Sequence, residues 1–245
     1  VAFLRCVLAC LVLWPLARVR DGAGAVPGRA LRLSLALQAV FGTAIWSWNK
    51  LGAEGGAAVY PWLIGSVIGS LVLALVTHWK KHLAYLTAPA YALCEGVILG
   101  AISALFEQRF PGIAMQATGI TATTLLGLLA AYRSGLIRAT ENFKLGVAAA
   151  TSGIFLLYLA SWILRMFGIE MPFLHSSGLI GIGISLFIVL IAALNLVLDF
   201  DFIEQGEANR APKHMEWYAA FGLLVTLVWL YLETLRLLAK LQSRD

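Results

Sequence analysis

Apolar runs of about 20 residues, the length of α-helix that crosses the hydrocarbon core of a bilayer, recur along most of the chain. No other feature of the sequence constrains its fold as strongly. The runs lie at residues 31–49, 57–78, 83–106, 113–132, 145–167, 178–200 and 217–239. Short connections rich in glycine, proline and charge separate them. The pattern predicts an all-α fold, a polytopic membrane protein with a bundle of seven transmembrane helices.

The composition agrees with a lipid environment and excludes other classes of protein. Hydrophobic residues make up 60% of the chain and charged residues 13%, which is far more apolar than an ordinary soluble domain. The net charge of +5 does not indicate a nucleic-acid partner, because the basic residues sit at the ends of apolar runs and form no continuous stripe. The three cysteines, Cys6, Cys10 and Cys94, lie in apolar stretches and are expected to be buried free thiols, with no disulfide framework or zinc site.

The first 30 residues differ from the rest. Residues 1–17 are apolar but short for a span and are interrupted by Arg5 and Pro15. Most of the positive charge follows this run, whereas a signal peptide carries it before the apolar core. A leader, a further helix and a mis-set start all remain open for residues 1–30, and residues 31–241 are expected to form the transmembrane domain.

The distribution of lysine and arginine predicts which side of the membrane each connection faces. If the segment before the first span is inside, nine basic residues lie inside and three lie outside before the last span. The inside residues are Arg29, Arg32, Lys80, Lys81, Arg133, Arg138, Lys144, Arg210 and Lys213; the outside residues are Lys50, Arg109 and Arg165. Arg236, Lys240 and Arg244 follow the last span and would break the rule, so the side of the C-terminus stays open.

The run 178–200 ends in the acidic sequence LDFDFIEQ, and carboxylates in a span cost about 2.5–3.5 kcal/mol at the helix centre. An intramembrane acid is therefore a candidate functional residue. Asp199 lies one helical turn after Asn195 and shares its helix face, whereas Asp201 points elsewhere and is most simply part of a solvated helix end. Asp199 either faces the bundle or is an inert, hydrated carboxylate at the interface.

Two further acids lie inside apolar runs. Glu233 is followed three residues later by Arg236, so it either forms an intrahelical ion pair of little energetic value or faces Asp199. Two carboxylates brought together at low dielectric cannot both ionise cheaply, so they would share a proton. Glu95 is either a protonated acid hydrogen-bonded to a hydroxyl or part of a permeation path. His78, before Trp79, Lys80 and Lys81, is expected to be an interfacial anchor.

Small residues four apart form close-packing faces in several spans. They are Gly65 and Gly69, Gly96 and Gly100, and Ser177, Gly181 and Ser185. The glycines near Gly178 follow no strand, so they predict helix packing rather than a nucleotide-binding loop. The sequence contains no catalytic triad pattern, phosphate-binding loop or metal-ligand motif, and neither an enzyme activity nor a cofactor is expected.

Four stretches resemble bacterial members of the Bax inhibitor-1 (TMBIM, YccA-like) superfamily. They are APAYALCEGVILGAISALFE (88–107), YRSGLIRATENFKLGVAAAT (132–151), HSSGLIGIGISLFIVLIAALNLVLDFDFIEQG (175–206) and MEWYAAFGLLVTLVWLYLETLRLLAKL (215–241). The resemblance implies a seven-helix bundle with the last helix central, in the bacterial cytoplasmic (inner) membrane. It also implies a pH-sensitive Ca²⁺ leak gated by two acids on the sixth and seventh helices.

Matching the LDF and LYLE sequences places those acids at Asp199 and Glu233, where Ca²⁺ would also bind. Glu95 and Asn195 become possible pore-lining residues, and His78 or Arg236 a possible basic partner of the pair. Relatives usually carry Asp where this chain has Glu233. Another branch of the superfamily is linked to a membrane-bound protease, so the alternative is a non-conducting regulator that binds such a protein within the lipid. The oligomeric state is open.

Overall fold

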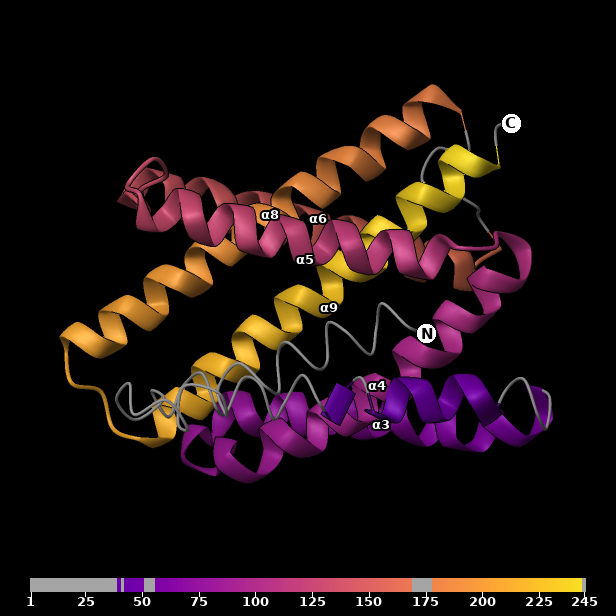
Figure 1. Cartoon of the computed structure of the whole chain (residues 1–245), viewed down its shortest axis with the longest axis horizontal. Helices are drawn as coiled ribbons and strands as arrows, with labels where there is room; N and C mark the ends of the chain where they lie inside the picture. Colours follow the sequence, from indigo (N-terminus) through magenta and orange to yellow (C-terminus); the bar gives the residue numbers. More distant parts are fainter. Residues whose placement is uncertain (1–38, 41, 51–55, 169–177, 244–245) are drawn as a thin grey trace, which may run out of the picture. The chain divides into compact units, whose positions relative to one another are not determined.

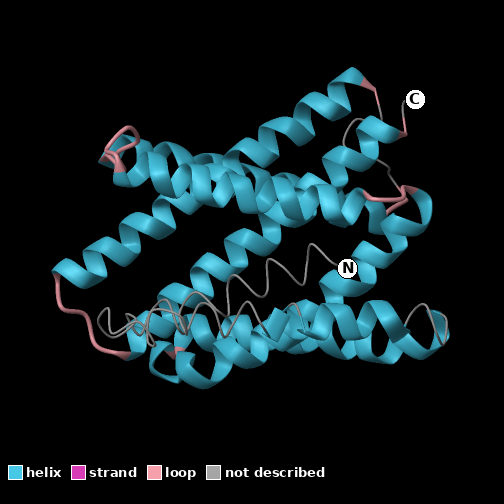
Figure 2. Ribbon diagram, viewed as in Figure 1, coloured by secondary structure: helices cyan, strands magenta, loops and turns pink. Residues whose placement is uncertain are grey.

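The computed structural model describes residues 39–40, 42–50, 56–168 and 178–243. Over these residues the chain consists of helices joined by short turns and contains no strand (Figure 2). Residues 39–40 and 42–50 are helical, and the elements that follow are α3 (Gly56–Trp79), the 3₁₀ turn η1 (Lys81–Leu83), α4 (Ala84–Arg109), α5 (Ile113–Arg133), α6 (Glu141–Met166), α8 (Leu179–Ala208) and α9 (His214–Gln242). The predicted all-α class is confirmed.

Six of these helices are long and apolar enough to cross a membrane, and they correspond to the last six predicted spans. The first predicted span, 31–49, lies largely outside the described residues, as do residues 1–30. The α9 helix is the most buried of the six spans. The protein is therefore a multi-pass helical membrane protein.

Several helices extend beyond their apolar runs. The α8 helix continues to Ala208 rather than ending near residue 200, and α6 begins at Glu141, four residues before its predicted start. Thr140 caps α6 by accepting a hydrogen bond from the Phe143 backbone N–H (3.3 Å), and Glu141 occupies the first turn, where a negative charge favours the helix dipole. Hydropathy marks the membrane core, whereas capping and backbone hydrogen bonding decide where a helix ends.

The chain divides into two compact units. Unit 1 takes in the described residues of Val1–Met115 together with Ile203–Val228, and unit 2 those of Gln116–Phe202 and Trp229–Asp245. The division falls within α5, α8 and α9, so each of these helices contributes to both units.

Unit 1 is built on close helix contacts. Helices α3 and α4 lie side by side (Figure 1), and the hydroxyl groups of Thr77 and Thr87 are hydrogen-bonded at 2.7 Å. The helix of residues 42–50 approaches α4 so closely that a Cβ at Gly96 would lie 1.8 Å from Thr43 Oγ1. One at Gly100 would lie 2.2 Å from the Ala44 carbonyl oxygen. The predicted small-residue face at Gly96 and Gly100 is a helix contact.

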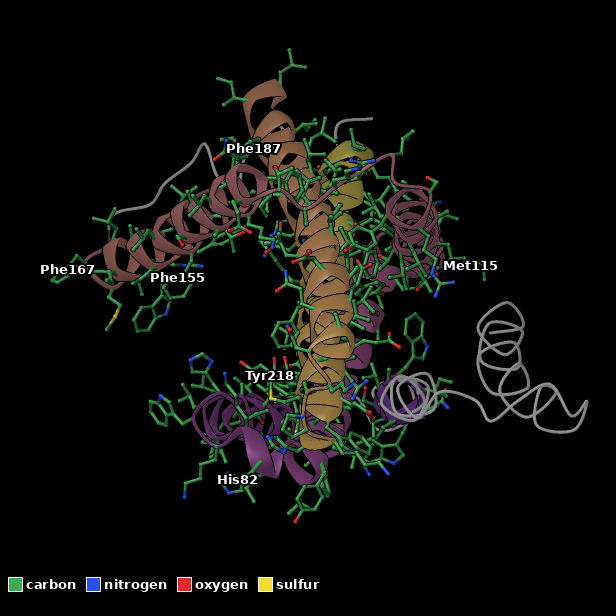
Figure 3. The ribbon with its side chains drawn as sticks, turned by 90° about the vertical axis from the view of Figure 1, so that its left-hand side faces the viewer. His82, Met115, Phe155, Phe167, Phe187 and Tyr218 are labelled. Atoms are coloured by element: carbon green, nitrogen blue, oxygen red, sulfur yellow. The ribbon has the colours of Figure 1, made fainter. Side chains whose placement is uncertain are left out.

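Unit 2 has an apolar cluster that joins three helices. Ile154 of α6 and Ile188 and Ile191 of α8 are buried together, and Trp229 of α9 packs against them. Phe155 of α6 and Phe167, which follows the end of that helix, project away from it and are exposed (Figure 3). Exposed apolar surface along so many helices is the pattern of a protein whose solvent is lipid.

Candidate functional site

Glu233 is a buried acid in unit 2, held between α9 and α6. Its side chain is 3% exposed. Arg236 Nη1 donates to both carboxylate oxygens, at 2.8 Å to Oε1 and 3.1 Å to Oε2, and the Tyr158 hydroxyl donates to Oε1 at 3.0 Å. The intrahelical ion pair suggested by the i, i+3 spacing is therefore present, and a second helix contributes to it.

Tyr158 binds both members of this pair. Its hydroxyl also accepts a hydrogen bond from Arg236 Nη1, and the guanidinium carbon lies 5.3 Å from the centre of its ring. A hydroxyl group can donate and accept at once, so one tyrosine satisfies the anion and the cation together. The Arg236 side chain is 43% exposed. We refer to Glu233, Arg236 and Tyr158 as the Glu233 cluster.

Lys240 adds a buried cation on the same face of α9. The positions 233, 236 and 240 follow the i, i+3, i+7 spacing of one helix face. Lys240 is 7% exposed, and its Nζ donates to the Gly181 carbonyl oxygen (3.0 Å) and to Ser185 Oγ (2.8 Å) of α8. In the sequence, Lys240 stands out only as a charge after the last apolar run. Its seven-residue spacing from Glu233 indicates that the two side chains share one face of the helix.

Asp199 and Asn195 lie on α8 in unit 2. Asp199 is half-buried. Asn195 Nδ2 donates to Thr151 Oγ1 of α6 and to the Ile191 carbonyl oxygen, both at 2.8 Å, so its amide joins two helices. The contacts that hold Glu233 come from Arg236 and Tyr158, and the shared Asp199–Glu233 gate stays a prediction.

Asp201 departs from the expected solvated helix end. Its Oδ2 lies 2.9 Å from Lys144 Nζ of α6, which also bonds to Glu141 at 3.1 Å. Asp201 thus links α8 to the first turn of α6.

Glu95 lies in unit 1, on α4, and is 8% exposed. Its carboxyl group has hydrogen-bonding partners in the Tyr91 and Ser70 hydroxyls. Cys94, expected to be buried, is a half-buried free thiol; Cys6 and Cys10 lie outside the described residues. His78 is exposed near the end of α3, also in unit 1. Among the described residues, no group of three or more His, Cys, Asp or Glu side chains is placed to hold a metal ion.

These features define a class of protein, a multi-pass helical membrane protein with charged and acidic groups buried inside its spans. The sequence model of the family described as Bax inhibitor 1 like matches residues 25–243 of the chain. The chain belongs to this family, and it is a membrane protein of the TMBIM type. No curated protein and no solved structure matches it.

Proposed function

We propose that the protein is a pH-sensitive cation leak of the bacterial cytoplasmic membrane, with Ca²⁺ as the permeant ion and no enzyme activity. The observation that supports this proposal most is the Glu233 cluster, an ionisable group buried in the last span and tied to α6. Ionisable groups in spans face bundle interiors or water-filled cavities and mark ion and proton pathways. Carboxylate oxygens are also the ligands that Ca²⁺ prefers.

The contacts of Glu233 provide a physical basis for the pH response. Ionised Glu233 holds Arg236 and Tyr158, so α9 and α6 stay together. Loss of these contacts would loosen the junction, and this is the proposed gating step.

Asp199 is the second proposed acid of the path. Two carboxylates can share a proton only at hydrogen-bonding distance, so the proposed gate needs Asp199 and Glu233 within direct or water-bridged reach of each other. Asn195, held by Thr151, contributes a polar group on the same face of α8 as Asp199.

The second candidate is a non-conducting regulator that binds another membrane protein, such as a protease. It does not require Asp199 and Glu233 to lie within reach of each other. It is favoured by a face of small, exposed residues on α6, namely Gly146, Ala149, Gly153 and Ala160. A Cβ added at Gly146 or Gly153 would meet nothing within 4 Å, so a partner helix has room to approach.

The test is Ca²⁺ flux into proteoliposomes over roughly pH 5–8. The wild type is compared with Asp199→Asn and Glu233→Gln. Glu141→Gln is the matched control, because the Glu141 side chain is 85% exposed. We expect a pH-dependent flux in the wild type and the control, and a pH response that is altered in both Glu233→Gln and Asp199→Asn. Folded wild-type protein without flux at any pH would exclude the leak and leave the regulator.

A further inference from the structure

A second buried acid, Glu95, lacks the counter-charge that Glu233 has. Both acids lie inside a candidate span and both are less than a tenth exposed. Glu233 forms an ion pair with Arg236, whereas no ion pair within the described part of the chain includes Glu95. The partners of the Glu95 carboxyl group are two hydroxyls, from Tyr91 one turn earlier on α4 and from Ser70 on α3.

Small apolar residues precede Glu95 on the same side of α4. Ala92 and Ala88, about one and two turns earlier, are fully or almost fully buried. Tyr91 is itself buried and packs edge-on against Phe221, with ring centres 5.0 Å apart. Cys94, the neighbouring residue, is half-buried and is the other titratable group beside the carboxyl.

The charged groups on the elements packed against α4 lie near helix ends. Lys81 and Arg109 are each 14 residues from Glu95, an axial distance of about 21 Å. Lys81 is also engaged elsewhere, with Nζ 5.0 Å from the centre of the Tyr218 ring. Other titratable groups on the described elements around α4 include Lys50 at the end of the helix of residues 42–50, Tyr60 and His78 on α3, and His214, Glu216 and Tyr218 on the first turns of α9.

An ionised carboxylate in such a place would lose its hydration without gaining a cation, which costs far more than burying the neutral acid. A protonated carboxyl group instead supplies one O–H donor and keeps acceptor oxygens for the two hydroxyls. We propose that Glu95, with Tyr91 and Ser70, forms a proton-binding site in unit 1 that is occupied at neutral pH. This inference does not depend on the leak.

Reaction with dicyclohexylcarbodiimide, an apolar reagent that enters bilayers, tests the proposal. Only a protonated carboxyl group reacts: its oxygen bonds to the central carbon of the reagent and its proton moves to a nitrogen, so nothing leaves. Mass spectrometry of the full chain in lipid then locates the adduct. We expect label on Glu95 at neutral pH, loss of that label in Glu95→Gln, and no label on ionised Glu233.

The variant Arg236→Gln shows whether the reagent reaches buried acids, because it removes the cation that keeps Glu233 ionised. If Glu233 is labelled in this variant while Glu95 stays unlabelled, the proposal is wrong. Protection of Glu95 by Na⁺ or Ca²⁺ at constant pH also overturns it, since the site would then hold a metal cation. Infrared spectroscopy gives a measurement that needs no reagent access: a protonated-carboxyl band present in the wild type and absent in Glu95→Gln supports the proposal, and a spectrum unchanged by the substitution contradicts it.

Discussion

The surroundings of Glu95 and Glu233 show two ways in which a helical membrane protein accommodates a buried acid. In unit 2, Glu233 is paired with Arg236 and joined to α6 through Tyr158. In unit 1, Glu95 is met by two hydroxyls and small apolar residues. The first arrangement stabilises a charge and the second stabilises a proton. Burial alone therefore does not determine the state of an acid, because the chemistry of its partners decides it.

The largest expected effect is that of Arg236→Gln, which leaves the Glu233 charge without its cation. We expect a loss of about 3 kcal/mol in the free energy of unfolding, the lower end of the range for a broken buried pair, since Arg236 is partly exposed. Unfolding in mixed detergent micelles measures it. The double variant Arg236→Gln/Glu233→Gln should recover part of the loss; equal losses in both would show that the charge of Glu233 is not the cause.

The next largest change in stability is expected for Gly100→Ala, in the closely packed helices of unit 1. A Cβ at Gly100 would lie 2.1 Å from Ser47 Oγ and 2.2 Å from the Ala44 carbonyl oxygen, so backbone as well as side chain has to move. We expect Gly100→Ala to cost about 2 kcal/mol through overpacking. Gly153→Ala on α6 is the matched control, with open space at the added Cβ and a gain of up to about 1 kcal/mol from helix propensity. The same unfolding assay applies, and a neutral Gly100→Ala would contradict the close helix contact.

A smaller effect is expected at the contact between α8 and α9. Ser185→Ala removes one acceptor of Lys240 Nζ, and we expect a cost of about 1–2 kcal/mol for the lost hydrogen bond to a charged donor. A double-mutant cycle with Lys240→Met isolates the pair. If Ser185→Ala costs as much in the Lys240→Met background as in the wild type, the two side chains are not coupled.

The smallest change in the free energy of unfolding is expected for Glu95→Gln. Glu95→Gln replaces a neutral acid by a neutral amide of similar shape, so we expect a change of less than about 0.5 kcal/mol, as for a substitution that breaks no buried interaction. Glu233→Gln should cost more, because Arg236 loses an anionic partner. The free energies of unfolding of the two variants, measured side by side at neutral pH, test this difference. A larger loss for Glu95→Gln than for Glu233→Gln would mean that Glu95 is the charged acid.

Much of the fold follows from the sequence alone. The last six apolar runs are the six candidate spans, because length and hydropathy are local properties of a helix in lipid. The contact face at Gly96 and Gly100 and the spacing of Glu233 and Arg236 are likewise encoded within single helices, by small-residue and i, i+3 patterns. The helix ends at Glu141 and Ala208 were missed because hydropathy does not register capping.

The partners across helices required the tertiary structure. Tyr158, Ser185 and Ser70 are ordinary residues in their own apolar runs, and nothing in those runs says which acid or base each one meets. Asp201 shows the same limit, since its partner Lys144 lies on another helix. Sequence periodicity fixes which residues share a face, but the rotation and axial register of packed helices depend on the fit of all their side chains. The sequence thus determined that acids lie in the membrane, and only the packing of α3, α6 and α8 decided which carboxyl group meets a cation and which meets hydroxyls.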